Sequence, residues 1–165
     1  MSRALRAEVT LEIGRNVTEV FAVLCDARAW PVWAHWARQV IVEPPGPIRV
    51  GSELRIARRG LDLHRRLRTV TDMRPDRLIA IEDESGNVRL WLHLEPSGDR
   101  SQVTARIELR PAGLIPFLRR HREQARMRSE LKRLKAMIES STGSRVAPSL
   151  TFTGGAIVGR ARESN

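Results

Sequence analysis

Strict alternation of apolar and polar residues begins close to the N-terminus. Ala7, Val9, Leu11 and Ile13 occupy every second position of residues 7–13. This spacing is typical of a strand with one buried face, because successive side chains of a strand point to opposite sides. Gly14 interrupts the alternation and predicts the end of the strand.

Two short helical segments are predicted after this strand. Asn16, with Glu19 three residues later, is typical of a helix start and predicts a helix over 17–25. Residues 26–36 predict a second helical or turn segment, in which Pro31 suits the first turn. Three tryptophans stand three residues apart in this segment, so we expect them along one side of it. They are Trp30, Trp33 and Trp36.

The middle of the chain has the pattern of one strand after another. Prolines and glycines separate the segments, and residues 85–87 (Ser-Gly-Asn) are a hairpin signal. Strands at hairpin spacing are typical of an antiparallel meander. The predicted strands cover 39–43, 52–59, 63–73, 77–83, 88–95 and 103–110.

A long amphipathic helix is predicted over 114–140. Its apolar stripe consists of Phe117, Met127, Leu131, Leu134 and Ile138, with Leu114 and Leu118 extending it upstream. The opposite side carries Arg119, Arg122, Arg126 and Arg133. Beyond this helix the composition shifts to Ser, Thr, Gly and Ala. We therefore expect one domain over 1–140 and a flexible tail over 141–165.

These elements predict an α+β domain. A curved antiparallel sheet of about seven strands would surround the long C-terminal helix, with the two short helices placed after the first strand. An apolar sheet face needs a cover, and only the C-terminal helix is long enough to provide it. Such an arrangement usually leaves space between sheet and helix, so we expect an internal cavity there.

Four motifs in this order resemble those of a known family. They are 17–21 (Val-Thr-Glu-Val-Phe), 29–33 (Ala-Trp-Pro-Val-Trp), 50–54 (Val-Gly-Ser-Glu-Leu) and 75–78 (Pro-Asp-Arg-Leu). The chain resembles the START-like (SRPBCC) superfamily, in its polyketide cyclase/dehydrase-like branch, over roughly residues 5–140. The resemblance implies the helix-grip fold. It carries over no catalytic residue, because the superfamily unites aromatase/cyclases with lipid and hormone binders.

Composition narrows the class of protein further. A length of 165 residues with 41% apolar residues suits one domain with a core. The single cysteine, Cys25, cannot form an internal disulfide, and the first thirteen residues do not form a signal peptide. No apolar run is long enough for a membrane span. We therefore expect a cytoplasmic protein. The histidines are scattered and no nucleotide-binding motif occurs, so we expect neither metal nor cofactor.

The net charge of +10 is unevenly distributed. Residues 55–68 and 114–142 each carry an excess of five positive charges, and the chain outside them and the tail is slightly acidic. Such clusters suit nucleic acid, an anionic membrane or an acidic partner protein such as a carrier protein. The absence of aromatic platforms beside them argues against nucleic acid. A solvated helix face with pairs such as Arg126–Glu130 is the simpler interpretation.

Tryptophans and helix residues are the first candidates for ligand contact. Trp33 and Trp36 offer rigid apolar area for a flat ligand, and Phe117 and Met127 lie on the helix stripe expected to face the cavity. The alternative is that the tryptophans serve only the packing of the fold. Trp36 is less constrained by the motif than Trp33.

Charged residues on apolar strand faces are the second candidates. By alternation, Arg58 is expected on the same strand face as Leu54. Arg65 and Thr69 are expected on the same strand face as Leu67. A charge on an inward face needs a partner, such as a ligand carboxylate or enolate, or an internal acid. The alternative is a bulge that turns these side chains to solvent.

Proton transfer would need a titratable group inside the pocket. His35 lies beside the tryptophans and His121 near the apolar side of the long helix. With Arg65 they are the candidate catalytic residues. No second group is spaced to orient either histidine, so a structural role is the alternative.

The sequence thus favours a protein that binds an apolar or aromatic small molecule, lipid or polyketide-like, in the internal cavity. One alternative is a polyketide cyclase/aromatase or dehydratase. Another is a basic module that docks on nucleic acid, an anionic membrane or an acidic protein. The sequence does not decide between binding and catalysis, or between monomer and homodimer.

Overall fold

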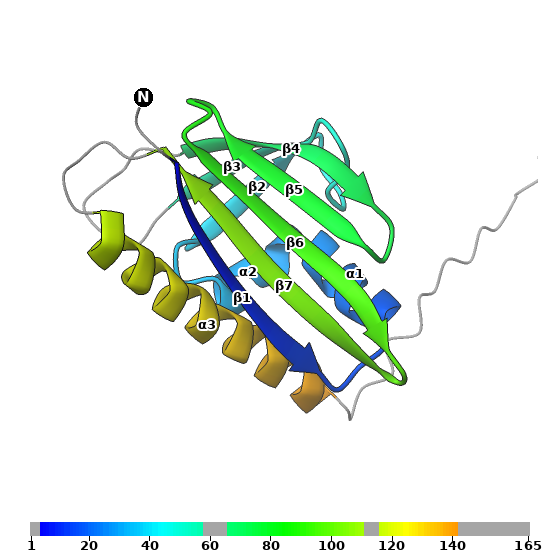
Figure 1. Cartoon of the computed structure of the whole chain (residues 1–165). Helices are drawn as coiled ribbons and strands as arrows, with labels where there is room; N and C mark the ends of the chain where they lie inside the picture. Colours follow the sequence, from blue (N-terminus) through cyan, green and yellow to red (C-terminus); the bar gives the residue numbers. More distant parts are fainter. Residues whose placement is uncertain (1–3, 58–65, 111–115, 142–165) are drawn as a thin grey trace, which may run out of the picture.

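Seven antiparallel strands form one sheet in the computed structural model, which describes residues 4–57, 66–110 and 116–141. The order across the sheet is β1-β7-β6-β5-β4-β3-β2, so β2 to β7 form a meander and β1 joins its far edge. Figure 1 shows the sheet curving in front of the short helices. The strands are β1 (Leu5–Ile13), β2 (Gln39–Glu43), β3 (Glu53–Ala57), β4 (Arg66–Arg74), β5 (Leu78–Asp83), β6 (Val88–Ser97) and β7 (Arg100–Leu109).

The helices lie where the sequence predicts them. α1 (Val17–Cys25) begins after Asn16, whose side chain accepts a hydrogen bond from the Glu19 backbone N–H at 2.9 Å. A 3-10 turn, η1 (Ala27–Ala29), leads into α2 (Trp30–Trp33), with a proline in the first turn of α2. α3 (Pro116–Ser140) lies along β1 (Figure 1). This is the predicted helix-grip architecture.

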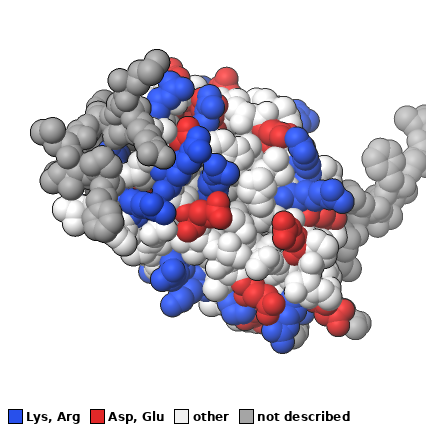
Figure 2. All heavy atoms as spheres, in the orientation of Figure 1, with Lys and Arg blue, Asp and Glu red and all other residues white. Residues whose placement is uncertain are grey.

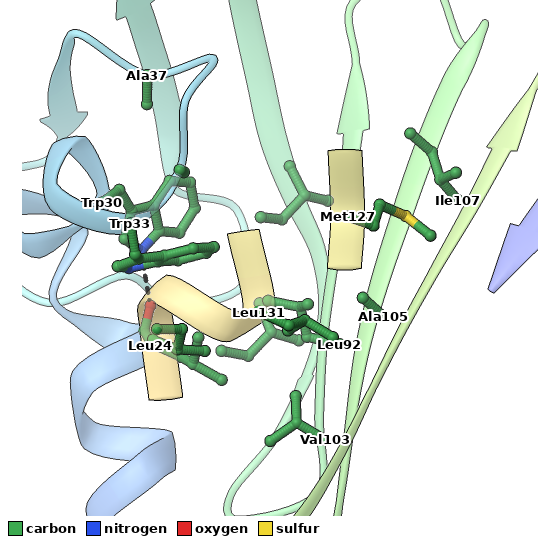
Figure 3. Packing of buried hydrophobic residues seen from close by; sticks show 14 of the residues in the cluster. Leu24, Trp30, Trp33, Ala37, Leu92, Val103, Ala105, Ile107, Met127 and Leu131 are labelled. Carbon is green, nitrogen blue, oxygen red and sulfur yellow. Dashed lines mark hydrogen bonds between the residues drawn. The ribbon is translucent and has the colours of Figure 1, made fainter. Parts of the chain in front are cut away.

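The core lies between the inner face of the sheet and the helices. On β6 and β7 the inner face carries the buried residues Leu92, Leu94, Val103, Ala105 and Ile107, as their alternation predicts. The stripe of α3 that meets them consists of Met127, Leu131, Leu134 and Ile138, all buried. Figure 3 shows side chains from α1, α2, the sheet and α3 converging on this interior.

The upstream end of the α3 stripe differs from the prediction. Leu118 is 63% exposed. It precedes Met127 by nine residues, about two and a half helical turns, so it points to the opposite side of α3. Leu114 and the side chain of Phe117 lie outside the described residues.

The prediction of which side chains of β4 face the interior is wrong. The inner face carries Leu54 of β3, which pairs directly with Arg68, and directly paired residues share a face. Arg68 and the buried Val70 therefore lie on the inner face, and Leu67 and Thr69 on the outer one. The apolar Leu67 suggested the opposite phase, whereas the pairing with β3 decides it. The pairing with β5 shifts between Val70 and Asp72, as at a bulge.

The C-terminal half of α3 is fixed to β1 and the turn after it. The Lys135 ammonium group donates to the Glu12 backbone carbonyl at 2.9 Å and to the Glu139 carboxylate at 2.7 Å. The same carboxylate oxygen accepts the Gly14 backbone N–H at 2.6 Å. A Cβ atom at position 14 would lie 2.9 Å from that oxygen, so glycine permits this close approach.

Two further predictions concern the extent of the domain and the possibility of a membrane span. Residues 142–165 of the predicted tail (141–165) are not among the described residues, so the domain boundary stays a prediction. No helix within the described ranges is both long and apolar enough to span a membrane.

Candidate functional site

The three tryptophans of the segment after α1 form a buried cluster. The Trp30 ring lies 6.2 Å from Trp33 and 5.8 Å from Trp36, between centroids, and both pairs meet edge to face. The Trp30 indole N–H donates to the Leu24 carbonyl at 2.9 Å, a bond drawn in Figure 3. All three side chains are buried. The spacing thus predicted correctly that they gather.

The Trp33 indole differs from that of Trp30 in its hydrogen bonding. Its N–H is buried, and it has no hydrogen-bond partner among the described residues. Buried polar groups are almost always satisfied in folded proteins. The Trp33 N–H is therefore a donor available inside the fold.

A cation lies on the inner side of the sheet beside this cluster. The Arg68 guanidinium carbon is 4.5 Å from the centre of the Trp36 ring. The negative face of an indole attracts a cation, most strongly where water is excluded. The strand pairing that sets the phase of β4 therefore also brings a charge to the tryptophans.

Glu130 of α3 is the acid of this region and is only 6% exposed. Its carboxylate accepts a hydrogen bond from the Trp36 side chain, and one of its oxygens lies 3.9 Å from Arg126 Nε. Arg126 also pairs with Glu123 at 2.7 Å, and the side chain of Glu123 is likewise largely covered. Arg126 and Glu130 therefore form the expected pair, but the expectation that solvent surrounds it is wrong, because Glu130 is buried.

Burial is the main influence on the Glu130 carboxyl. Loss of hydration raises its pKa from 4.5 to about 7, against the lowering effects of Arg126 and the Trp36 hydrogen bond. Glu123 raises the pKa slightly further and Arg133 lowers it. A carboxyl with a pKa near neutrality can hold or release a proton under physiological conditions.

The other predicted site residues occupy varied positions. Met127 is buried in the core, whereas His35 and His121 are exposed, and His121 has contacts of its own. Thr69 lies on the outer side of the sheet, which is a correction of its expected place at the cavity. Arg58, Arg65 and the side chain of Phe117 lie outside the described residues, so their roles stay predictions. The expected cavity between the sheet and α3 also stays a prediction.

Arg68, Glu123 and Glu130 were not predicted as site residues, and Glu130 was expected only as a solvated partner of Arg126. The two acids share the inner side of α3 with Met127, at spacings of four and three residues. The helical period alone could therefore have placed them. Arg68 could not be placed in this way, because its direction depends on the pairing with β3.

The outer face of the sheet carries a second group of polar residues. An open depression of about 1120 Å³ lies there, and it includes Trp91 and Arg106, whose guanidinium carbon is 5.8 Å from the indole centre. Figure 2 shows cations and anions interleaved over this face. Ion pairs such as Arg6–Glu108 (2.9 Å) and Arg89–Glu82 (3.0 Å) join neighbouring strands. Within the described ranges, no three metal-binding side chains gather on either face.

The chain is similar in sequence to a known protein family. Residues 4–139 match the family model described as "Polyketide cyclase / dehydrase and lipid transport". A search of the curated proteins finds no match.

Solved structures share the fold at low sequence identity. The Aha1 dimer from Colwellia psychrerythraea has a TM-score of 0.63 and 15% identity, over 84% of this chain and 98% of that one. The Polyketide_cyc-like protein Cgl2372 from Corynebacterium glutamicum has a TM-score of 0.51 and 19% identity, over 85% and 86%. The di-domain ARO/CYC StfQ from the steffimycin biosynthetic pathway has a TM-score of 0.65 and 15% identity, over 86% of this chain and 52% of that one.

Proposed function

The chain belongs to the polyketide cyclase / dehydrase and lipid transport family, and from this membership we propose that it binds an apolar or aromatic small molecule between the sheet and α3. One observation carries the proposal. The tryptophan cluster lies beside two charged side chains, the half-buried Arg68 and the buried Glu130. A buried carboxyl is costly and is rarely needed for stability alone, so a ligand that uses Glu130 explains its presence. Aromatic rings would supply most of the contact area.

Native mass spectrometry of the purified protein is the first test. We expect a co-purifying apolar molecule, released when the protein unfolds. Protein that has lost this molecule is then titrated with a neutral aromatic probe, N-phenyl-1-naphthylamine.

The four tryptophans of the chain make the place of binding measurable. Each gives an indole N–H signal in a ¹⁵N-correlated NMR spectrum, and Trp→Phe variants assign the signals. We expect the probe to shift the signals of Trp33 and Trp36 and to leave that of Trp91, on the outer face, unchanged. A shift confined to Trp91 would place the ligand in the outer depression and contradict the proposal.

Catalysis by a cyclase/aromatase or dehydratase is the second candidate function. The observation that favours it is the buried Glu130 carboxyl, whose pKa of about 7 suits proton transfer. Among the described residues it is better enclosed than His35 or His121. The fold shared with the ARO/CYC StfQ agrees with this class of activity. Cyclisation of a linear poly-β-ketone by the wild type, lost in Glu130→Gln but kept in His35→Gln, would support it.

Docking on an acidic partner protein is a third candidate, for the exposed side of α3. The three acids of the helix are engaged with Arg126 or Lys135, and the exposed side keeps only cations. These are Arg119, Arg120, Arg122, Arg128, Lys132 and Arg133. Association with an acidic carrier protein should weaken steeply between low and moderate salt, and an unchanged affinity would contradict it.

A further inference from the structure

Two buried polar atoms at the tryptophan cluster have no hydrogen-bond partner among the described residues. They are the indole nitrogen of Trp33, in a side chain 4% exposed, and Oε1 of Glu130, which lies 3.9 Å from Arg126 Nε, too far for a hydrogen bond. A buried polar atom without a hydrogen-bond partner loses its bonds to water and gains no hydrogen bond in return. Such atoms therefore point to a molecule that completes them.

Both atoms border the same cluster. The Trp30 ring contacts those of Trp33 and Trp36, and the Trp36 side chain in turn donates to the Glu130 carboxylate. One atom is a donor and the other, in the ionised form, an acceptor. A ligand lying against these indoles could complete both with its polar end.

The charges nearby limit the polar end of the ligand to a neutral group. A carboxylate placed beside Glu130 would be repelled by it, and Arg126, 3.9 Å from Glu130, already offsets the negative charge that would attract an amine. A hydroxyl group carries no charge and both donates and accepts. It therefore matches Glu130 whether or not that carboxyl is ionised.

We propose that the ligand is a neutral hydroxylated aromatic molecule, whose hydroxyl is recognised by Glu130 and which presents an oxygen acceptor to the Trp33 N–H. This inference rests on the proposed binding of an apolar or aromatic molecule. It adds that selection among such molecules depends on two hydrogen bonds. A hydrocarbon of the same shape would leave both buried atoms unsatisfied.

Two ligands of nearly equal size test the inference by isothermal titration calorimetry. They are 2-naphthol and 2-methylnaphthalene, which differ by a hydroxyl in place of a methyl group. We expect the wild type to bind 2-naphthol at least about tenfold more tightly. Glu130→Leu and Trp33→Phe should each reduce this preference severalfold, and affinity for 2-methylnaphthalene should stay unchanged or rise.

A matched control and the folded state of each variant complete the design. Glu95→Leu removes an exposed acid that lines the outer depression and should keep the preference of the wild type. Circular dichroism confirms folding, and Glu130→Met, which also lacks a strong hydrogen-bonding group, replaces Glu130→Leu if that variant fails to fold. Equal binding of both ligands, or a preference kept in both inner variants, would overturn the inference and leave the proposed function standing. If neither ligand binds, the proposed function itself fails.

Discussion

Trp36 meets a cation with the face of its ring and an acid with its edge. The Arg68 guanidinium carbon lies 4.5 Å from the ring centre, while the indole side chain donates to the Glu130 carboxylate. An indole has a negative face and a positive edge, so both contacts follow its charge distribution. Trp36 thus links β4 to α3 and is the central residue of the candidate site.

Replacement of Arg68 by lysine tests the stacking on Trp36. Lysine keeps the charge but not the planar group that covers an indole. We expect Arg68→Lys to lower the free energy of unfolding by about 1 kcal/mol, measured by urea denaturation. Arg89→Lys is the control, because Arg89 pairs with Glu82 on the exposed outer face, and it should cost less than about 0.5 kcal/mol. Equal effects of the two substitutions would contradict the assigned contact.

The Glu130 carboxyl should make stability depend on pH in an unusual direction. Its pKa is raised from 4.5 to about 7 in the folded protein, so the folded state holds the proton longer than the unfolded state. The contribution of Glu130 to the free energy of unfolding is therefore full below about pH 4.5. It is lost as the pH rises to about 7, by up to about 3 kcal/mol.

Glu130→Gln removes this titration. Urea denaturation at pH 5 and pH 8 should show a loss of stability with rising pH in the wild type that is larger than in the variant. Glu95→Gln, which alters an exposed acid, should behave as the wild type does. An identical pH dependence in wild type and Glu130→Gln would mean that Glu130 is not buried as described.

Local signals predicted the helices and most strands, and long-range pairing decided the site. Asn16 and the alternation of β6 and β7 act within a few residues, so their consequences could be predicted from the sequence. The phase of β4 depends on which residue of β3 lies opposite Arg68, and no local pattern contains this pairing. Glu130 is an intermediate case. Its helical position predicts an inward direction, but the common exposure of glutamate argued for solvent.

Cys25 should be an unreactive thiol in the folded protein. Burial, assisted by the charge of Asp76, raises its pKa to about 11, so little thiolate exists near neutral pH. We expect iodoacetamide at pH 8 to modify the native protein at least about a hundredfold more slowly than the urea-unfolded protein. Mass spectrometry over time measures both rates. Similar rates would show that the thiol is exposed, and they would also question the position of α1, which carries it.

The contact between Glu139 and Gly14 should contribute to stability as one unit. The Glu139 carboxylate accepts the Gly14 N–H at 2.6 Å and binds Lys135, which fixes the end of α3 over the turn after β1. Glu139→Ala should lower the free energy of unfolding by about 1 kcal/mol. Gly14→Ala should cost a similar amount, because its Cβ would lie 2.9 Å from the carboxylate oxygen and displace it. The double variant should then cost little more than either single variant, since both changes break the same contact.

Glu12→Ala is the control, because it removes only an exposed pair with Arg100 and should cost less than about 0.5 kcal/mol. Additive losses in the double variant would show that the two residues act independently.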